Sequence, residues 1–195
     1  MKLIIGITGA TGSIYAIRLL EVLAEKPDIE THLIMSDTAK QVLVYETGRK
    51  VAEIEKLATK VHNNDDLAGG PASGTFRADG MIVIPCTAKT LSALARSDSD
   101  NLIVRAGDVI LKERRRLVAV FREAPLHLGH IRAMEQLTEI GGIILPPVPA
   151  FYNHPESIED IVNHTVGKVL DLFDISHNLY TPWEGIKKGP RYPTI

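Results

Sequence analysis

The residues best suited to chemistry lie early in the chain, in the segment Thr8-Gly9-Ala10-Thr11-Gly12-Ser13. This glycine-rich segment joins an apolar run, Lys2–Ile7, to an amphipathic pattern over Ser13–Glu25. A strand, a tight turn and a helix start bring free backbone N–H groups and the positive end of the helix dipole to one point, where a phosphate group can bind. The alternative is a strand-to-helix turn without a ligand. The pattern favours the phosphate site and leaves open which molecule carries the phosphate.

Small hydroxyl residues follow two further apolar runs. Ser36 comes after Thr31–Met35, and the segment Pro85-Cys86-Thr87-Ala88-Lys89-Thr90 comes after Met81–Ile84. Because the carboxyl ends of parallel strands meet at one edge of a sheet, these hydroxyls can line a crevice for a phosphate and for ring polar atoms. Ser and Thr also cap helices at such positions, and a capping residue can still contact a ligand. Both interpretations stay open.

The glycine pattern fits a nicotinamide cofactor poorly. A third glycine is needed where Tyr15 stands, and the candidate acid after the second strand, Asp37, is preceded by Ser36. The sequence contains no Tyr-x-x-x-Lys pair. A cofactor with one phosphate, such as FMN, needs one phosphate site and suits a chain of this size.

Cationic side chains are concentrated in the second half of the sequence. Five of the twelve residues from Arg105 to Arg116 are Lys or Arg. Such a run is ordinarily a solvated face, but the spacing of Arg105 and Lys112 would put both on one side of a helix. Arginine grips phosphate through a fork of N–H groups, so this half of the chain has the residue types for a second phosphate. The further candidates for it are Arg122, Tyr152 and Lys168.

Apolar runs alternate with helical patterns along most of the chain. The predicted strands are Lys2–Ile7, Thr31–Met35, Met81–Ile84, Leu117–Val120 and Gly142–Leu145. The predicted helices are Ser13–Glu25, Asp37–Glu46, Thr87–Arg96, Gly129–Glu139 and Ile158–Phe173. This order predicts an α/β fold, a single doubly wound, Rossmann-like (flavodoxin-like) parallel sheet with helices on both faces. The segment Asn63–Gly80 is predicted to be a long loop.

Composition limits the classes of function. The chain has 195 residues, of which 45% are hydrophobic, and a formal net charge of −2. We therefore expect one domain over residues 1–195 with an irregular tail from about residue 175, and no nucleic-acid partner, since no surplus of cations is present. The single cysteine, Cys86, fits a reducing compartment. No signal pattern or membrane-length apolar run occurs, so we expect a cytoplasmic protein without a membrane partner.

Taken in order, these segments resemble the UbiX-type flavin prenyltransferases over nearly the whole chain, from Lys2 to Trp183. The resemblance is carried by Gly9–Gly12, Ser36, Glu46-Thr47, Pro71–Gly74, Pro85–Thr87, Asn101–Ala106, Leu111–Arg115, Arg122-Glu123 and Pro147–Tyr152. The segments Phe76–Gly80 and Phe151–Pro155 are most similar to members that accompany non-oxidative aromatic-acid decarboxylases.

The resemblance implies an enzyme that joins a dimethylallyl group from dimethylallyl phosphate to N5 and C6 of reduced FMN. The product, prenylated FMN, would serve a separate UbiD-type decarboxylase. The resemblance also implies that no metal is needed and that the chain assembles into a homo-dodecamer with sites shared between subunits. It places FMN contacts at Gly9, Ala10, Thr11, Ser36, Thr87, Ala88, Lys89, Thr90 and Arg122, and prenyl-phosphate contacts at Tyr152 and Lys168. Arg105, Lys112 and Glu123 match polar residues around that phosphate, and Glu46 matches an acid near the flavin.

Charge development explains these residue types. Breaking the allylic C–O bond leaves an allyl cation and a phosphate, which cations at Lys112, Arg122 and Lys168 would stabilise. We expect Glu123 to transfer a proton with the departing phosphate and Glu46 to handle protons at the flavin. The alternative for each glutamate is an ion pair with a neighbouring Arg or Lys.

Two other functions remain open from the sequence. One is an FMN-dependent cysteine decarboxylase, whose chemistry would centre on a histidine in the first half, where only His32 and His62 occur. The other is a non-catalytic flavin-binding subunit of an aromatic-acid decarboxylase. The sequence does not decide whether the donor is a monophosphate or a diphosphate.

Overall fold

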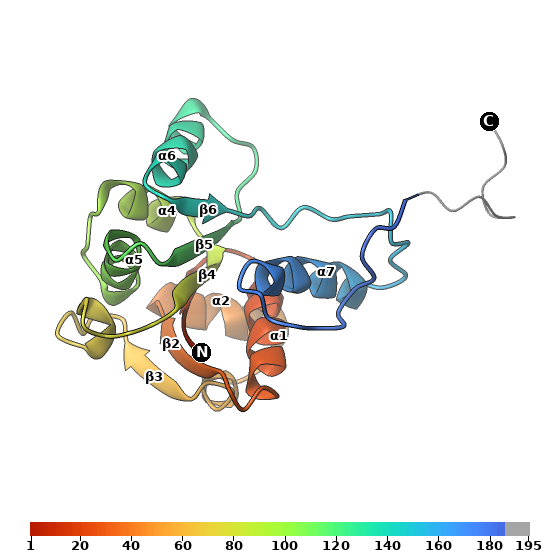
Figure 1. The fold of residues 1–195 in the computed structure, drawn as a ribbon, viewed down its shortest axis with the longest axis horizontal. Helices are drawn as coiled ribbons and strands as arrows, with labels where there is room; N and C mark the ends of the chain where they lie inside the picture. Colours follow the sequence, from red (N-terminus) through yellow and green to blue (C-terminus); the bar gives the residue numbers. More distant parts are fainter. Residues whose placement is uncertain (186–195) are drawn as a thin grey trace, which may run out of the picture. The chain divides into compact units, whose positions relative to one another are not determined.

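The computed structural model describes residues 1–185 (Figure 1). Internal contacts divide the chain into two compact units, Met1–Val148 and a second unit that begins at Pro149. The single domain predicted over residues 1–195 stays a prediction. The part of the predicted irregular tail beyond residue 185 lies outside the described residues.

The first unit is built on a six-stranded parallel sheet with the strand order β3-β2-β1-β4-β5-β6. This order, with helices following the strands, confirms the predicted doubly wound, Rossmann-like fold. The chain order reverses between β1 and β4, so a crevice is expected at the carboxyl ends of these two strands. The strands are β1 (Lys2–Ile7), β2 (Glu30–Met35), β3 (Lys60–Asn63), β4 (Gly80–Cys86), β5 (Arg116–Phe121) and β6 (Gly142–Ile144).

Helices connect these strands, and side chains from the preceding loops cap several of them. Asn101, for example, accepts a hydrogen bond from the Val104 N–H at the start of α5, at 3.1 Å. The helices of the first unit are α1 (Ser13–Ala24), α2 (Asp37–Thr47), α3 (Val51–Glu55), α4 (Ala88–Arg96), α5 (Leu102–Lys112) and α6 (Leu128–Glu139), with a short 3₁₀ turn η1 (Gly70–Ala72). The second unit contains α7 (Ile158–Asp171).

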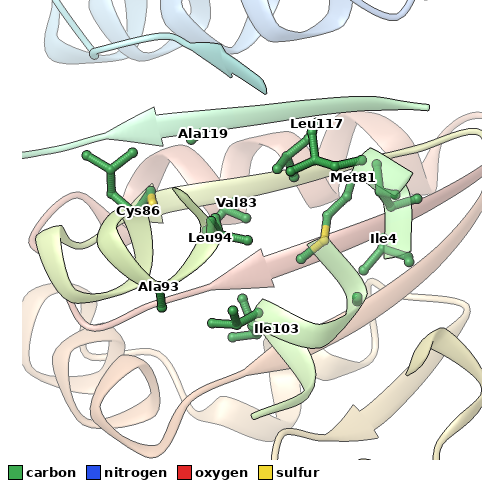
Figure 2. Close-up of a cluster of buried hydrophobic side chains, with 14 of the residues drawn as sticks. Ile4, Met81, Val83, Cys86, Ala93, Leu94, Ile103, Leu117 and Ala119 are labelled. Atoms are coloured by element: carbon green, nitrogen blue, oxygen red, sulfur yellow. The ribbon is translucent and has the colours of Figure 1, made fainter. Parts of the chain in front are cut away.

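The sheet is buried on both faces, as its nearly continuous apolar strands require. On one face, Ile4, Met81 and Leu117 pack with Leu94 of α4 and Ile103 of α5 (Figure 2). The alternate residues of these strands point to the opposite face. There α1 packs against β4, so helices lie on both sides of the sheet (Figure 1).

The structure corrects several predicted boundaries and adds four elements, namely β3, α3, α5 and the 3₁₀ turn η1. The predicted loop Asn63–Gly80 starts at the end of a sixth strand, β3, and ends at the start of β4. The strand β3 lacks an apolar run because it is a mostly exposed edge strand. The short helix α3 was not predicted, and α5 was considered only as a possible helix. The predicted helix Thr87–Arg96 begins at Ala88, with Thr87 as its cap.

In the part of the chain that the structure describes, no helix has the length and apolar character needed to cross a membrane.

Candidate functional site

The loops after β1 and β4 are locked together at the point where the strand order reverses. The Thr8 hydroxyl donates to the Pro85 carbonyl oxygen at 2.8 Å and accepts from the Thr87 N–H at 2.9 Å. Thr8 is 4% exposed, so this pair of hydrogen bonds is buried. A buried, doubly satisfied hydroxyl fixes the spacing of the two loops.

Gly9 is required by the close approach of its loop to α2. A Cβ atom built on Gly9 would lie 2.4 Å from Thr38 Cγ2, inside any permitted contact. Gly12, the N-cap residue of α1, has φ 104°, a left-handed conformation that favours glycine. The glycine-rich segment is thus needed for its backbone path, whether or not a ligand is bound.

The predicted hydroxyls cap helices and also border a cavity. Ser36 accepts from the Ala39 N–H at 3.1 Å at the start of α2, and Thr87 accepts from the Thr90 N–H at 3.2 Å at the start of α4. The cavity, of about 280 Å³, lies at the carboxyl end of the sheet. Its lining includes five of the predicted flavin contacts, Gly9, Ser36, Thr87, Lys89 and Thr90.

Lys89 is the ammonium beside this cavity. Its side chain is 78% exposed and pairs with Asp100 at 3.4 Å. An exposed pair of this kind is weak, so the ammonium can leave Asp100 for a phosphate at small cost. Of the four remaining predicted contacts, Ala10 lies in the loop after β1 and Ala88 at the first position of α4. The other two, Thr11 and Arg122, border a different cavity.

A second cavity, of about 450 Å³, adjoins the start of α1 and the end of β5. Its lining includes Thr11, Tyr15, Arg122 and Glu123. The structure therefore brings Arg122 and Glu123, the predicted site residues that follow β5, next to the glycine-rich segment. The Arg122 N–H donates to the Cys86 carbonyl at 3.0 Å, which ties the residue after β5 to the end of β4. Burial raises the pKa of the Tyr15 phenol, and the Arg122 charge opposes this shift.

The Glu46 carboxylate lies at the amino end of α1, where a phosphate was predicted. It accepts the Ser13 N–H at 2.9 Å and the Gly12 N–H at 3.1 and 3.2 Å. Partial burial acts to raise the pKa of Glu46. Hydrogen bonds from the Thr11 hydroxyl and from the Ser13 and Gly12 N–H groups outweigh burial and hold the pKa below its ordinary value.

The free N–H groups that the predicted phosphate site at the α1 amino end requires are therefore partly occupied by Glu46, and the site itself stays a prediction. Two of its N–H groups already bind an ionised side chain, and the expected alternative for Glu46, an ion pair with Arg or Lys, is replaced by this helix cap. An anion at a helix amino end is stabilised by the helix dipole, as a phosphate would be.

Arg105 and Lys112 lie on one side of α5, as their spacing predicts, but face the segment around η1. Arg105 donates to the Ala72 carbonyl at 3.2 Å and pairs with Asp108 at 2.9 Å. Lys112 pairs with Glu113. Lys112 precedes the start of β5 and Arg122 follows its end. Nine residues separate them in sequence, and six of these form β5, which spans about 20 Å. One copy of the first unit therefore does not bring Lys112 to Arg122.

Tyr152 and Lys168 belong to the second unit. The Tyr152 hydroxyl is 2.9 Å from Nε2 of His164, and the Tyr152 and Trp183 rings meet edge to face at 5.4 Å. Lys168, on α7, pairs with Asp171 at 3.4 Å. Tyr152, Tyr180 and Trp183 line a cavity of about 770 Å³ within this unit.

The roles of three residues of these sites were not predicted from the sequence. Thr8 belongs to the glycine-rich segment, and the signal for its role is a hydroxyl placed directly after a buried strand. Tyr15 lies three residues after Gly12, and His164 lies four residues before Lys168. Closeness in sequence to a predicted site residue is only a weak signal. Among the described residues, no group of three or more His, Cys, Asp or Glu side chains is placed to hold a metal ion.

Comparison with known proteins gives one family. The profile of the Flavoprotein family matches residues 1–170. The flavin prenyltransferase UbiX of Thauera aromatica is 51% identical over 185 residues, which are 95% of each chain.

Two solved structures are similar over nearly the full length. The dodecameric FMN-dependent UbiX-like decarboxylase from Escherichia coli O157:H7 has a TM-score of 0.93 and 48% identity, covering 95% of this chain and 100% of its own. The structure of AnUbiX (PadA1) in complex with FMN and dimethylallyl pyrophosphate also has a TM-score of 0.93, with 46% identity, covering 95% of this chain and 98% of its own. The chain therefore belongs to the Flavoprotein family and, within it, to the UbiX flavin prenyltransferases.

Proposed function

We propose that this protein is a flavin prenyltransferase that joins the dimethylallyl group of dimethylallyl phosphate to N5 and C6 of reduced FMN. The observation that carries the proposal is the full-length similarity to AnUbiX, whose structure contains FMN and dimethylallyl pyrophosphate. The glycine, hydroxyl and ammonium groups around the 280 Å³ cavity support it, because these are the groups that bind a phosphate monoester.

The residues at the carboxyl end of the sheet fit FMN. The Gly9 backbone borders the cavity, Ser36 and Thr87 present hydroxyls to it, and Lys89 supplies an ammonium held by a weak, exposed ion pair. Since Glu46 binds the N–H groups of Gly12 and Ser13, the FMN phosphate would bind the hydroxyls and Lys89 instead. Arg122, in the neighbouring cavity, would face the flavin ring.

When bound, the reduced isoalloxazine supplies the electron-rich nucleophile. Tyr152 and Lys168 would hold the donor's phosphate through a phenol and an ammonium, and both stabilise the negative charge that grows there as the allylic C–O bond breaks. Glu123 would exchange a proton with the departing phosphate. Glu46, held ionised at the start of α1, would fix the glycine-rich loop and is a poor proton donor at neutral pH.

Arg105 and Lys112 would serve a site that contains the Arg122 of another copy, because one copy holds Lys112 and Arg122 at opposite ends of β5. A site shared between copies requires an oligomer. We propose a homo-dodecamer, because the similar structure from Escherichia coli O157:H7 is dodecameric. We further propose that the product passes to a UbiD-type decarboxylase and that the protein works in the cytoplasm. The free thiol of Cys86 is compatible with a reducing compartment.

The test is anaerobic incubation of the protein with FMN, a reductant and either dimethylallyl phosphate or dimethylallyl diphosphate, followed by mass analysis of the flavin. A flavin heavier by one dimethylallyl unit is expected, and the two arms decide which donor is used. Bound FMN of unchanged mass with both donors would overturn the proposal. In that event, release of carbon dioxide from a peptide ending in cysteine would indicate the cysteine decarboxylase. If no carbon dioxide were released either, a non-catalytic flavin-binding subunit would be indicated.

A further inference from the structure

His164 lies behind the two groups proposed to hold the donor's phosphate. It is placed on α7 four residues before Lys168, so the two side chains share one face of the helix. Its Nε2 atom is 2.9 Å from the Tyr152 hydroxyl oxygen, well within hydrogen-bond distance. A single imidazole thus contacts the phenol and shares a helix face with the residue that carries the ammonium.

The imidazole is held in a fixed orientation. His164 is 8% exposed, and its ring packs edge to face with Tyr152 at 5.7 Å and tilted against Tyr180 at 4.8 Å. Tyr180 reaches this position because residue 167 is glycine, where a Cβ atom would lie 2.6 Å from the Tyr180 ring. Rings on two sides leave His164 little freedom to turn away from Tyr152.

The direction of the hydrogen bond decides what the phenol can offer a ligand. A neutral imidazole has one N–H donor and one acceptor nitrogen. Burial and, after it, the Lys168 charge lower the pKa of His164, which favours this neutral form. If Nε2–H donates to Tyr152, the phenol proton points elsewhere and can bind an anion. If Nε2 accepts, the phenol proton is used up by the histidine.

Phosphate oxygens near neutral pH are mainly acceptors, so a bound phosphate selects the first arrangement. We propose that His164 is a positioning residue for the donor: Nε2–H donates to the Tyr152 oxygen and directs the phenol proton to the phosphate of dimethylallyl phosphate. This inference rests on the proposed function, since it concerns the same donor. It adds a residue that acts through Tyr152 without touching the substrate.

A double-mutant cycle tests this coupling. His164→Phe keeps an aromatic ring and removes both nitrogens, and Tyr152→Phe removes the phenol oxygen. We expect each single variant to weaken dimethylallyl phosphate binding about 5- to 10-fold, the range for one hydrogen bond, while FMN affinity stays unchanged. In turnover, the change should appear in the donor KM more than in kcat. His164→Phe should cost nothing further in the Tyr152→Phe background, because its effect passes through the phenol.

Calorimetric binding of dimethylallyl phosphate to the FMN-loaded protein is the primary measurement, so the outcome does not depend on turnover. The inference would be overturned if His164→Phe weakened donor binding by the same factor in the wild-type and Tyr152→Phe backgrounds. It would also be overturned if His164→Phe weakened FMN binding as much as donor binding. His164→Gln, which keeps an N–H donor, should recover part of the donor affinity and serves if the Phe variant does not fold. Glu159→Gln, at an exposed carboxylate in the first turn of α7, is the control and should match wild type.

The two proposals fail in different ways. A wild-type protein that binds dimethylallyl phosphate but forms no prenylated flavin would remove the transferase function, while the cycle of binding constants would still decide the role of His164. A protein that makes the product but shows no coupling between His164 and Tyr152 would remove only the positioning role.

Discussion

Glu123, for which we propose a role in proton transfer, lies just after the end of β5. It is exposed in the same cavity as Arg122, and the contact observed for its carboxylate is with the N–H of its own neighbour, Ala124, at 3.1 Å. This leaves the group available to a ligand.

Glu123→Gln keeps the size and removes the proton-transfer capacity. We expect FMN to bind as before and prenylated FMN to form about 100-fold more slowly, the lower end of the range for a positioned acid–base group. Single-turnover formation of the heavier flavin is the measurement. Turnover at the wild-type rate would exclude Glu123 from the mechanism.

Lys168 is proposed to bind the phosphate of the donor and not that of FMN. Its partner, Asp171, is 3.4 Å away, and the pair is half exposed, so the ammonium is available for exchange with a phosphate. Lys168→Ala should raise the donor KM by roughly 10-fold or more through loss of one charge-assisted contact, with little change in FMN affinity. Flavin fluorescence titration and donor kinetics separate the two effects, and equal losses would contradict separate phosphate sites.

At the scale of elements, the Glu46 side chain of α2 caps α1. Glu46→Gln keeps an acceptor for Gly12 and Ser13 but loses the charge that faces the helix dipole. We expect the free energy of unfolding of the FMN-free protein to fall by about 0.5 kcal/mol. This value is at the low end of the range for a charge at a helix end, because Glu46 is exposed.

The pH dependence gives a second measurement on this cap. Because the pKa of Glu46 is lowered in the folded state, its contribution is present above the ordinary value of 4.5 and is lost as the pH falls through the folded pKa. Urea unfolding near neutrality and again near pH 3 should therefore show the difference between Glu46→Gln and wild type shrinking in acid. A constant difference would show that charge is not the cause.

A chain of hydrogen bonds joins β2 to the edge strand β3. His32 Nδ1 lies 2.8 Å from His62 Nε2, and His32 Nε2 lies 2.8 Å from the Glu30 carboxylate. Burial lowers the pKa of both histidines. A bond between two imidazoles needs one lone pair, so protonation of both rings breaks it.

The direction of the pH dependence of stability follows from proton binding. As the pH drops, the unfolded chain binds more protons than the folded protein. We expect this contribution to the free energy of unfolding to be fully present above the ordinary histidine pKa of 6.5. It should decline as the pH falls from 6.5 toward the lowered pKa values of the two histidines in the folded protein. Urea unfolding at about pH 7.5 and 5.5 measures it. His62→Gln should flatten the dependence, and an unchanged slope would show that other groups cause it.

At the scale of the whole molecule, the separation of Lys112 from Arg122 supports the proposal that two copies contribute to each site. Lys112→Ala and Arg122→Ala proteins should each be inactive or nearly so. Co-expressed, they should recover part of the activity, because some sites then combine a native Lys112 from one copy with a native Arg122 from another.

The neighbours Arg122 and Glu123 provide the matched control. They lie on one copy at the end of β5, so mixing Arg122→Ala with Glu123→Gln should recover nothing. Size-exclusion chromatography with light scattering gives the assembly state of each mixture. Equal recovery in both mixtures would contradict a site shared between copies.

The sequence by itself determined the sheet and the loops that it presents. Apolar runs such as Lys2–Ile7 and Leu117–Val120 must be buried on both faces, which permits only a covered parallel sheet, and the order of the motifs identifies the family. It could not reveal β3, whose polar side chains carry no burial signal at an exposed edge.

Tertiary structure alone decided which groups meet. The Glu46 carboxylate reaches the α1 amino end across 34 positions of sequence, and Thr8 joins Pro85 across 77. The sequence showed the type of each residue, whereas these pairings depend on how α2 packs against α1 and how β4 pairs with β1. Local pattern records which face of an element is buried, because that face must be apolar. It does not record which polar atoms then come within 3 Å of one another, because many residue types satisfy the same hydrogen bond.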